Sequence, residues 1–296
     1  MRLAWPRPRA DKLTLDERRA LATILAAPTF ELLPLKNAMD QAGHLPPGST
    51  VSVTASPAKG LDATLALAAD LRAAGFRAVP HLSARMVRDR VHLSDIVAWL
   101  HSAGVTRAFV VGGDAKDPGA YPDGLSLLRD LAEIGHPLTE IGVPCYPEGH
   151  AVIPNDTLLE ALRSKVPFAT YMTTQMCFDP KAIEVWLWSR RAEGIGLPVH
   201  LGVPGVAEAH RLLAISARIG VADTGRFVSK NVGFVARLLR SGGFYRPNGL
   251  LEGLAPLIAG PAAGVVDLHL YTFNAVDLTE RWRKAFLERL GVRAAA

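Results

Sequence analysis

The feature that most limits the fold of this chain is an alternation of short β-rich runs with longer helical stretches. The runs are rich in β-branched and aromatic residues, whereas the stretches between them carry leucine and alanine at helical spacing. Parallel strands need a crossover between them, so this alternation favours a parallel sheet. We expect strands over residues 29–35, 49–56, 77–84, 107–114, 140–148, 168–175, 198–205 and 267–274.

Eight such units within 296 residues predict an α/β fold of the (β/α)8 TIM barrel class, with an open doubly wound sheet as the alternative. Gly75 and Gly104 are expected to end the first two helices, and Ser94 with Asp95 to begin the second. The helices are expected over residues 60–74, 94–103, 124–134, 156–164, 180–193, 206–219, 229–241 and 248–259, with a last one from near Leu278.

An amphipathic stretch over residues 15–26 precedes the first strand, with Leu15, Leu21, Ile24 and Leu25 on its apolar side. We therefore expect residues 1–27 to form an N-terminal helical extension and residues 28–296 to form a single catalytic barrel domain. The longest connection, residues 221–266, lies between the seventh and eighth strands, and its role is open.

Composition narrows the function classes. The net charge of +5 is spread along the chain without a block of like charges, which argues against a nucleic-acid-binding arm. No continuous apolar stretch predicts a signal peptide or a membrane span. Cys145 and Cys177 form no CxxC motif, so we expect no disulfide, no metal site and a cytoplasmic location. The oligomeric state, including a homo-oligomer, stays open.

Polar or ionisable residues fall at or near the carboxyl ends of most expected strands. In a parallel barrel these ends open on one face, where the active site lies. The residues are Glu31, Thr54, His81, Asp114, Tyr146 with Glu148 and His150, Gln175, and Asn274. A single strand-end histidine is more often structural, but seven strands that share the pattern favour a functional face.

The pieces at these strand ends resemble the methylenetetrahydrofolate reductase family in the family's order, over residues 29–290. They are "FELLP", "VSVT", "PHL", "GGD" followed by "PGAYPDG", "YPEGH", "TQMCFD", "GVPG" and "HLYTFN". The resemblance implies a (β/α)8 barrel that binds FAD at its carboxyl face. It also implies hydride transfer from NADH or NADPH to 5,10-methylenetetrahydrofolate, giving 5-methyltetrahydrofolate in one-carbon and methionine metabolism.

By this resemblance Glu31 matches the general acid. The substrate holds its one-carbon unit between two nitrogens of a five-membered ring, and the ring opens only when the departing nitrogen gains a proton. Because Phe30, Leu32 and Leu33 surround Glu31 in the sequence, we expect desolvation to raise the pKa of its carboxyl. The structural alternative is a surface pair between Glu31 and Lys36.

Asp114 matches the family's strand-four aspartate, whose charge stabilises the cation formed on ring opening. Gln175 matches an amide that bonds the pterin or the nicotinamide, and Gly113 with Gly112 is expected to let a flat ring approach the backbone. As alternatives, Asp114 caps a turn and Gln175 is structural. Positions that match flavin contacts are Thr54, His81, Tyr121, Tyr146, His150, Lys165 and His269. Cys177 is expected to be a buried thiol.

The chain departs from the family where FAD is held. The arginine usual before the strand-four Gly-Asp is Gly112, and the arginine after the strand-eight asparagine is Ala275. An acid, an asparagine and an arginine on the helix before strand six are Leu158, Ala161 and Ser164 here. Two explanations follow: arginines of the 221–246 loop hold FAD, or hydride passes directly from NAD(P)H to the folate.

Two other function classes are weighed. A folate-binding paralogue without reductase activity, regulatory or serving a demethylation pathway, would not need the acid Glu31. An unrelated barrel lyase or synthase would need a Schiff-base lysine or a metal cluster at the strand ends, and neither is present in the sequence.

Overall fold

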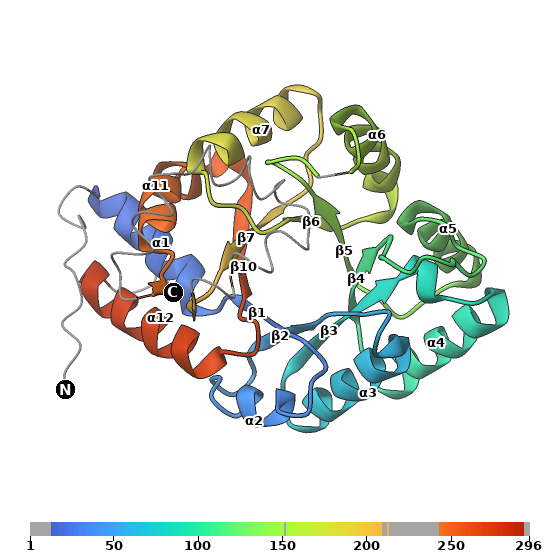
Figure 1. Cartoon of the computed structure of the whole chain (residues 1–296). Coiled ribbons are helices and arrows are strands. Elements are labelled where there is room, and N and C mark those ends of the chain that lie inside the picture. The colour runs from blue at the N-terminus through green and yellow to red at the C-terminus, as the bar shows by residue number, and fades with distance from the viewer. Residues whose placement is uncertain (1–12, 151, 209–211, 213–242, 293–296) are drawn as a thin grey trace.

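A closed barrel of eight parallel strands forms the centre of the chain in the computed structural model, which describes residues 13–150, 152–208, 212 and 243–292 (Figure 1). The strands are β1 (Thr29–Leu32), β2 (Thr50–Val53), β3 (Arg77–Ser83), β4 (Arg107–Val111), β5 (Glu140–Cys145), β6 (Tyr171–Thr174), β7 (Val199–Pro204) and β10 (Val265–Tyr271). They pair in chain order, and β10 closes the ring against β1. The prediction of a (β/α)8 barrel is confirmed, and the open doubly wound sheet is excluded.

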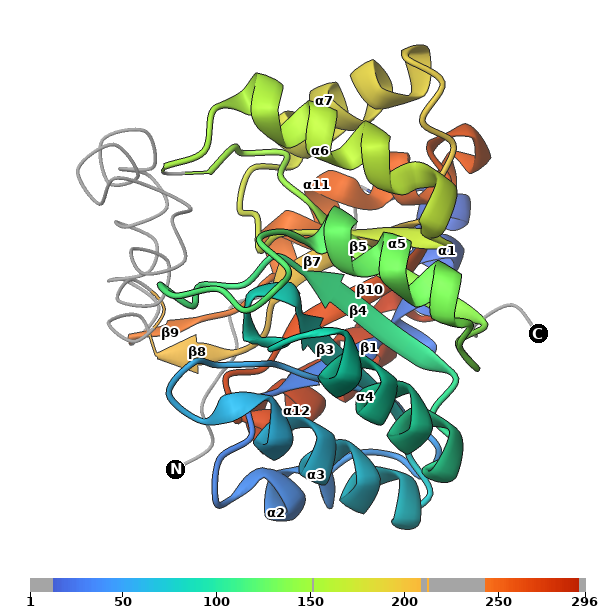
Figure 2. The same cartoon turned by 90° about the vertical axis from the view of Figure 1, so that its right-hand side faces the viewer.

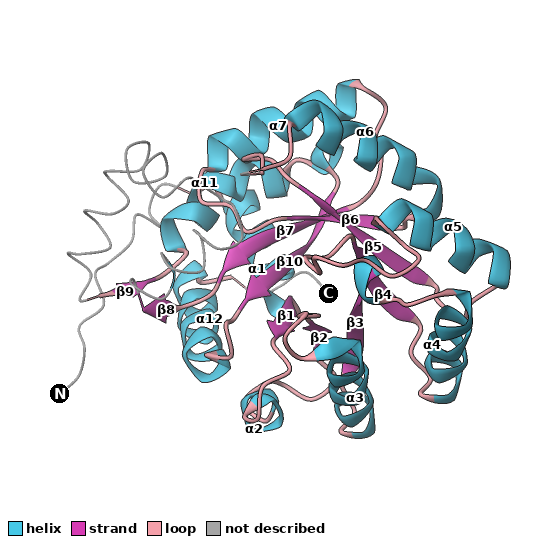
Figure 3. Cartoon of the chain, turned by 45° about the vertical axis from the view of Figure 1, so that its right-hand side comes forward, coloured by secondary structure: helices cyan, strands magenta, loops and turns pink. Residues whose placement is uncertain are grey.

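Helices cover the outside of the barrel, as Figure 3 shows. They are α1 (Leu15–Ala26), α2 (Ala38–Ala42), α3 (Gly60–Ala73), α4 (Arg90–Ser102), α5 (Gly124–Ile134), α6 (Asn155–Lys165), α7 (Pro180–Ala192), α11 (Asn248–Ala259) and α12 (Val276–Leu290). Short 3-10 turns are η2 (Ala84–Met86), η3 (Val166–Phe168) and η4 (Pro261–Ala263). The expected bounds of α1, α5 and α11 are confirmed.

Three helix predictions need correction or fall outside the described residues. Helix α4 begins at Arg90, not at residue 94, because Asp89 accepts a hydrogen bond from the backbone N–H of His92 and caps the helix. Ala207 and Glu208, expected to be helical, form β8, which pairs antiparallel with β9 (Phe244–Tyr245). The rest of the expected helix over 206–219 lies outside the described residues except for residues 206 and 212, and so does the one over 229–241.

The strands are shorter at their carboxyl ends than the sequence predicts. Strand β4 stops at Val111, so Asp114 lies in the following loop, and β6 stops at Thr174, one residue before Gln175. Figure 2 shows the strand arrowheads pointing toward the end of the barrel where β8 and β9 lie. The loops at this carboxyl end therefore carry several of the predicted site residues.

Side chains alternate along each strand between the outer surface and the interior of the barrel. On β1, Phe30 and Leu32 are buried in the main hydrophobic core, whereas Thr29 and Glu31 have the opposite parity. Register continues the inner row across the closure, since Glu31 lies opposite Ser52 of β2 and Tyr271 of β10. The interior of this barrel therefore holds buried polar groups together with a small apolar cluster of Val79, Phe109 and Tyr171.

Helix α1 packs against α11 and α12 on the outside of the barrel (Figure 1). Arg283 of α12 donates hydrogen bonds to the carbonyls of Leu25 and Ala26, and its other nitrogens bind Glu280 at 2.7 Å. These bonds satisfy carbonyls that the end of a helix leaves unpaired. Leu15, expected on the apolar side, is 49% exposed instead. The division at residues 27 and 28 stays a prediction.

Candidate active site inside the barrel

Glu31 lies inside the barrel between two histidines. Its Oε2 is 3.1 Å from Nε2 of His269 and 3.8 Å from Nε2 of His81. All three side chains are buried. The alternative pairing of Glu31 with Lys36 is excluded, because Lys36 is exposed and the carboxylate faces the barrel interior. The site therefore begins with a buried carboxyl that can exchange a proton with an imidazole.

The surroundings of Glu31 differ from those expected. Its neighbours Phe30 and Leu32 point to the opposite face of β1, because side chains alternate along a strand. Polar groups from other strands take their place around the carboxyl. The apolar pocket inferred from the run "TFELLPL" is therefore not the environment of this residue.

The backbone around Glu31 is held by the end of β10. Thr272 Oγ1 donates to the carbonyl of Glu31 at 2.6 Å. Asn274 accepts from the N–H of Leu33 at 2.8 Å and donates to its carbonyl at 3.0 Å. Phe273 and Asn274 both have positive φ, at 51° and 56°, a strained conformation that such bonds can maintain. This clamp fixes the height of Glu31 within the barrel.

His81 lies beside Glu31 and bonds to β2. Its Nε2 is 2.8 Å from Oγ of Ser52, and its ring lies 4.8 Å from that of Phe109. Burial lowers the pKa of His81 to about 4, partly offset by the nearby Glu31 carboxylate and reinforced by His269. His81 is therefore a neutral imidazole at pH 7.

Asp114 lies at the rim, exposed to solvent, in the loop after β4. Arg85 supports that loop by donating from Nε to the carbonyl of Ala115 at 2.6 Å and from a terminal nitrogen to that of Lys116 at 2.9 Å. Within the described residues no hydrogen bond of the Asp114 carboxylate is found, and the cap of the following helix is Asp123. The carboxylate of Asp114 is therefore available to a ligand.

The two glycines before Asp114 have different roles. Gly113 has φ +89°, and a Cβ there would lie 1.9 Å from Oγ of Ser83. Gly113 is thus required by backbone conformation and by its contact with β3. A Cβ at Gly112 would meet nothing within 4 Å, so the missing arginine leaves open space there.

The remaining rim residues come from three strand ends. Tyr146 and His150 lie edge to face with ring centroids 5.6 Å apart, and burial raises the pKa of Tyr146 to about 12. Asp114 adds to this shift through its charge, so the β4 and β5 loops are neighbours. Gln175 is half-buried, and its Oε1 accepts from the N–H of Met176 at 2.8 Å. Thr54 is half-buried just beyond β2.

Two further predicted flavin contacts, besides His81 and His269, are buried away from solvent. Tyr121 is 4% exposed in the hydrophobic core, and its hydroxyl donates to Asp130 at 2.8 Å. It does not offer the flat surface expected of it. Lys165, the last residue of α6, is also buried near Cys145 and Asp123, and desolvation lowers its pKa. The roles predicted for both need side chains that a ligand can reach.

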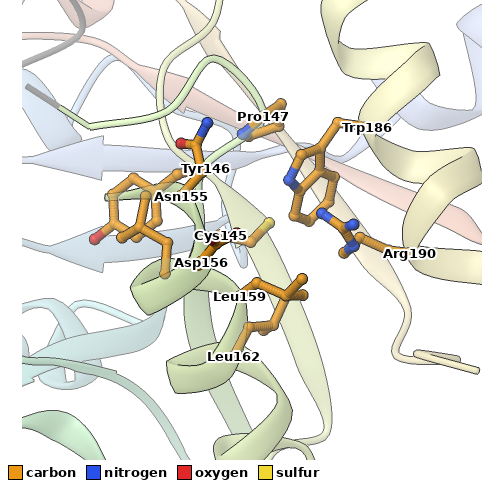
Figure 4. A pocket seen from close by; sticks show the side chains of 10 residues that line it. Cys145, Tyr146, Pro147, Asn155, Asp156, Leu159, Leu162, Trp186 and Arg190 are labelled. Atoms are coloured by element: carbon orange, nitrogen blue, oxygen red, sulfur yellow. The ribbon is translucent and has the colours of Figure 1, made fainter. Parts of the chain in front are cut away.

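A cavity of about 170 Å³ lies between α6 and α7, next to Tyr146 (Figure 4). Leu158, Leu159 and Leu162 line one side, and Trp186 with Arg190 lies across from α6. The Arg190 guanidinium is paired with Glu193, so the lining offers apolar surface and a neutralised cation. Among the described residues, the side chains that line this cavity supply no unpaired cation for the pyrophosphate of FAD, whereas the uncapped start of α6 at Asn155 supplies backbone N–H groups.

Two buried hydroxyls face the barrel without a partner in the part of the chain that the structure describes. They are Ser83 Oγ and Thr173 Oγ1. Buried polar groups are nearly always hydrogen-bonded, so unpaired ones mark places where a ligand or water supplies the partner. The interior of the barrel therefore has two hydroxyl groups that can form hydrogen bonds with a bound ligand or with water.

The two cysteines, potential metal ligands and membrane-spanning helices can be examined in the described residues. Cys145 and Cys177 are buried free thiols, and burial raises the pKa of each, which confirms the expectation for Cys177. Across the described ranges no group of three potential metal ligands is found. In the same ranges no helix has the length and hydropathy needed to cross a bilayer.

Several residues near Glu31 were not singled out by the sequence. They are Ser52, His200, Asp267, Tyr271 and Thr272. The alternation in "DLHLY" places Asp267, His269 and Tyr271 on one face of a strand, and this signal could have identified the first and last of them. No local signal points to Ser52, because its contact with His81 joins two residues 29 positions apart.

Comparison with known proteins places the chain in a family. A protein-family model described as methylenetetrahydrofolate reductase matches residues 31–222. Among solved structures, one from Burkholderia cenocepacia J2315, provisionally assigned as a lyase/mutase, is 17% identical, with 93% of this chain and 85% of that chain covered and a TM-score of 0.45. A chitinase from Rhizomucor miehei is 10% identical, with 86% and 99% covered and a TM-score of 0.44. These structural likenesses carry no inference about chemistry.

Proposed function

Since the chain belongs to the methylenetetrahydrofolate reductase family, we propose that it reduces the methylene group of a methylene-tetrahydrofolate to a methyl group. The hydride comes from a reduced nicotinamide dinucleotide. The observation that carries this proposal is the buried Glu31 carboxyl at 3.1 Å from His269 within the barrel. A protein that only binds a folate has no need of a carboxyl placed to exchange protons.

Glu31 would act as the acid that opens the substrate ring. A proton passes from its carboxyl to the departing nitrogen, the bond from that nitrogen to the methylene carbon breaks, and an iminium cation remains. Hydride from the nicotinamide then adds to the cationic carbon and leaves oxidised nicotinamide. Charge and atoms balance, with one proton and one hydride consumed for each methyl group formed.

Asp114 would stabilise the cation from the rim. Its carboxylate is exposed, makes no hydrogen bond within the described part of the chain, and lies near Tyr146. A negative charge that is already in place lowers the energy of a developing positive charge without reorganisation. Gln175, at the next strand end but one, is a candidate for hydrogen bonding to the planar ring of the substrate or the nicotinamide.

Members of this family generally bind flavin, and the described residues divide on this point. The rim could receive a flat ring near Asp114, but the side chains between α6 and α7 supply no unpaired cation for a pyrophosphate. Of the arginines of the 221–246 loop that were suggested as substitutes, those before residue 243 lie outside the described residues, and Arg246 is half-buried. We therefore derive no step through a flavin.

The test is the absorbance spectrum of the purified protein together with anaerobic turnover of methylenetetrahydrofolate with NADH and with NADPH. Glu31→Gln should abolish reduction, by about a hundredfold or more, since positioned acids contribute at least that factor. Binding of the dinucleotide should persist, because Glu31 lies below the rim. Lys36→Gln changes an exposed residue in the loop that follows β1. It is the control and should keep wild-type rates.

Flavin bands near ~450 nm would show a bound flavin, and a colourless protein that oxidises the dinucleotide would show direct transfer. Folate binding without turnover by the wild type would support the regulatory paralogue in place of a reductase. Full turnover by Glu31→Gln would remove Glu31 from the acid role while leaving the family assignment intact.

A further inference from the structure

A second cavity opens at the opposite end of the barrel from the rim, where the strands begin. It has a volume of about 320 Å³, large enough for several water molecules. Its walls include first residues of strands, namely Thr29, Thr50, Arg77, Arg107 and Glu140. The barrel is thus hollow and polar at its N-terminal mouth.

The cavity runs inward to His269. Side-chain exposure falls from 39% at Glu140 and 28% at Arg107 to 19% at Asp267 and 16% at His200, and reaches 4% at His269. All five residues line the cavity. This gradient indicates a path that begins in solvent and ends at an imidazole.

His269 is also the residue that touches Glu31 from below. Its Nε2 is 3.1 Å from the carboxylate, and Glu31 does not line the cavity. The imidazole therefore separates the N-terminal cavity from the candidate acid and is bonded to that acid.

We propose that the N-terminal mouth is a proton inlet, in which water reaches His269 and His269 returns to Glu31 the proton spent in each turnover. This inference rests on the proposed function of Glu31 as an acid. It assigns His269 to proton supply, acting through Glu31, in place of the flavin contact expected from the sequence.

The proton balance is simple. After Glu31 protonates the departing nitrogen, its carboxylate is negative. His269 gives it the Nε2 proton, and the imidazole regains a proton from cavity water, whose hydroxide exchanges with bulk solvent. No electrons move, and the net result is one proton carried from the N-terminal side to Glu31.

Charged and titratable groups from five strands line the cavity or lie beside His269. They are Glu31 on β1, His81 on β3, Arg107 on β4, His200 on β7, and Asp267 and Tyr271 on β10. Asp267 accepts from Thr29 Oγ1 at 2.6 Å and lies 3.5 Å from His200. Burial raises the pKa of Asp267 to about 6, so this carboxyl can hold a proton near neutral pH.

The rim offers a competing path, since substrate-bound water could reload Glu31 from above. Product release would be needed first, and the bonds of Thr272 and Asn274 close β1 to β10 at that level. The inlet keeps working while the rim is occupied by dinucleotide and folate, which is its advantage.

The first experiment measures exchange of the imidazole C–H of His269 with deuterium, by mass spectrometry of the full chain. Val266→Trp places a bulky ring at the cavity mouth, where Val266 is 58% exposed. We expect it to slow exchange at His269 severalfold. Val185→Trp, the same change at an exposed position on α7, is the matched control and should leave exchange unchanged. Equal exchange in both variants, confirmed folded by thermal melting, would overturn the inlet.

The second experiment follows His269→Gln through successive turnovers. A glutamine can still bond to Glu31 but cannot pass a proton on. We expect a first turnover at nearly the wild-type rate, later turnovers slower by about tenfold or more, and an unchanged KM for the folate. The lag should deepen as pH rises, and added imidazole should relieve it. Equal slowing of the first and later turnovers would mean a structural role only.

The two proposals fail separately. If the wild type reduces no folate, the proposed function falls, and exchange at His269 in Val266→Trp still decides whether the inlet exists. If reduction occurs and His269→Gln shows no difference between first and later turnovers, the inlet falls and the reductase remains.

Discussion

The predicted site residues divide into two tiers with different physical character. Glu31, His81 and His269 lie buried deep within the barrel, with both imidazoles beside the Glu31 carboxylate. Asp114 lies at the rim in an exposed loop beyond its strand. Chemistry that needs a controlled proton belongs in the deep tier, where water is scarce. Recognition of a large, charged ligand belongs at the rim.

This division explains how a barrel of this family can differ at a residue that contacts the cofactor and still retain the glutamate that matches the acid. The deep tier is fixed by strands and by the clamp at Asn274, so it changes only with the fold. Rim residues occupy loops, where substitutions such as Gly112 meet open space. Of the departures from the family, Gly112 and Ala275 lie outside the helices and strands, whereas Leu158, Ala161 and Ser164 lie on α6.

The largest expected effect is acid lability from the deep histidines. His81 has a folded pKa of about 4 and His200 of about 3, both lowered chiefly by burial. The unfolded chain therefore binds more protons between pH 6.5 and these values, and stability is lost as pH falls through that window. His81 alone contributes about 3 kcal/mol, at 1.36 kcal/mol for each pKa unit.

His81→Asn should flatten this dependence when urea unfolding is measured between pH 4.5 and 7. Asp267 has a raised pKa and therefore acts with the opposite sign, so its contribution falls as pH rises between about 4 and about 6. Asp267→Asn should make the acid loss steeper. Identical slopes for the wild type and His81→Asn would contradict burial as the cause.

Asp114→Asn tests the rim tier. We expect kcat to fall by about thirtyfold, or 2 kcal/mol, because the carboxylate charge that faces the cation is removed. Thermal stability should stay at the wild-type value, since the side chain is exposed. Asp117→Asn, three residues further in the same loop, is the matched control and should retain activity. A loss of stability as large as the loss of activity would place Asp114 in the fold and not in the chemistry.

Gly113→Ala tests the contact between the rim loop after β4 and Ser83 of β3. The substitution introduces a Cβ at 1.9 Å from Ser83 Oγ in a backbone with positive φ, and we expect a loss of about 2 kcal/mol in unfolding free energy. Gly112→Ala, one residue earlier, should be nearly neutral because nothing lies within 4 Å of the new atom. Chemical denaturation of the pair measures the difference, and equal losses would refute this account of the two glycines.

Gly112→Arg should produce the smallest effect. A guanidinium there would have room and could bind a phosphate, so we expect FAD to bind about tenfold more tightly than to the wild type, equivalent to one charge-assisted hydrogen bond. Equilibrium titration of flavin fluorescence measures it, with Gly112→Gln as the uncharged control. If glutamine and arginine give the same affinity, charge at this position is not what limits the binding of FAD.

The sequence predicted the barrel because each strand and helix carries local signals. Helix α5 lies between an N-cap aspartate, Asp123, and a C-cap glycine, Gly135. Both residue types commonly flank helices, so its bounds were predicted correctly. Helix α4 was missed at its start because Asp89 and Ser94 are both plausible caps, and only the bond to His92 distinguishes them. Local signals identify elements better than their ends.

The depth of each site residue was not predictable in the same way. His81 and His269 were placed with the flavin contacts, yet both lie in the middle of long strands and turn inward to Glu31. Tyr121 follows a motif typical of the rim, but its hydroxyl bonds to Asp130 on α5. Depth and pairing depend on strand register and on helix packing, which link residues far apart in the chain.

The closure of β10 on β1 has a consequence for how the protein is made. Glu31 and His269 are separated by 238 positions along the chain. Glu31 therefore leaves the ribosome well before His269, and a fragment that stops before Val265 has neither the closing strand nor His269 as a partner for Glu31. Such a fragment cannot form the contact between His269 and Glu31 on which the proposed proton supply depends.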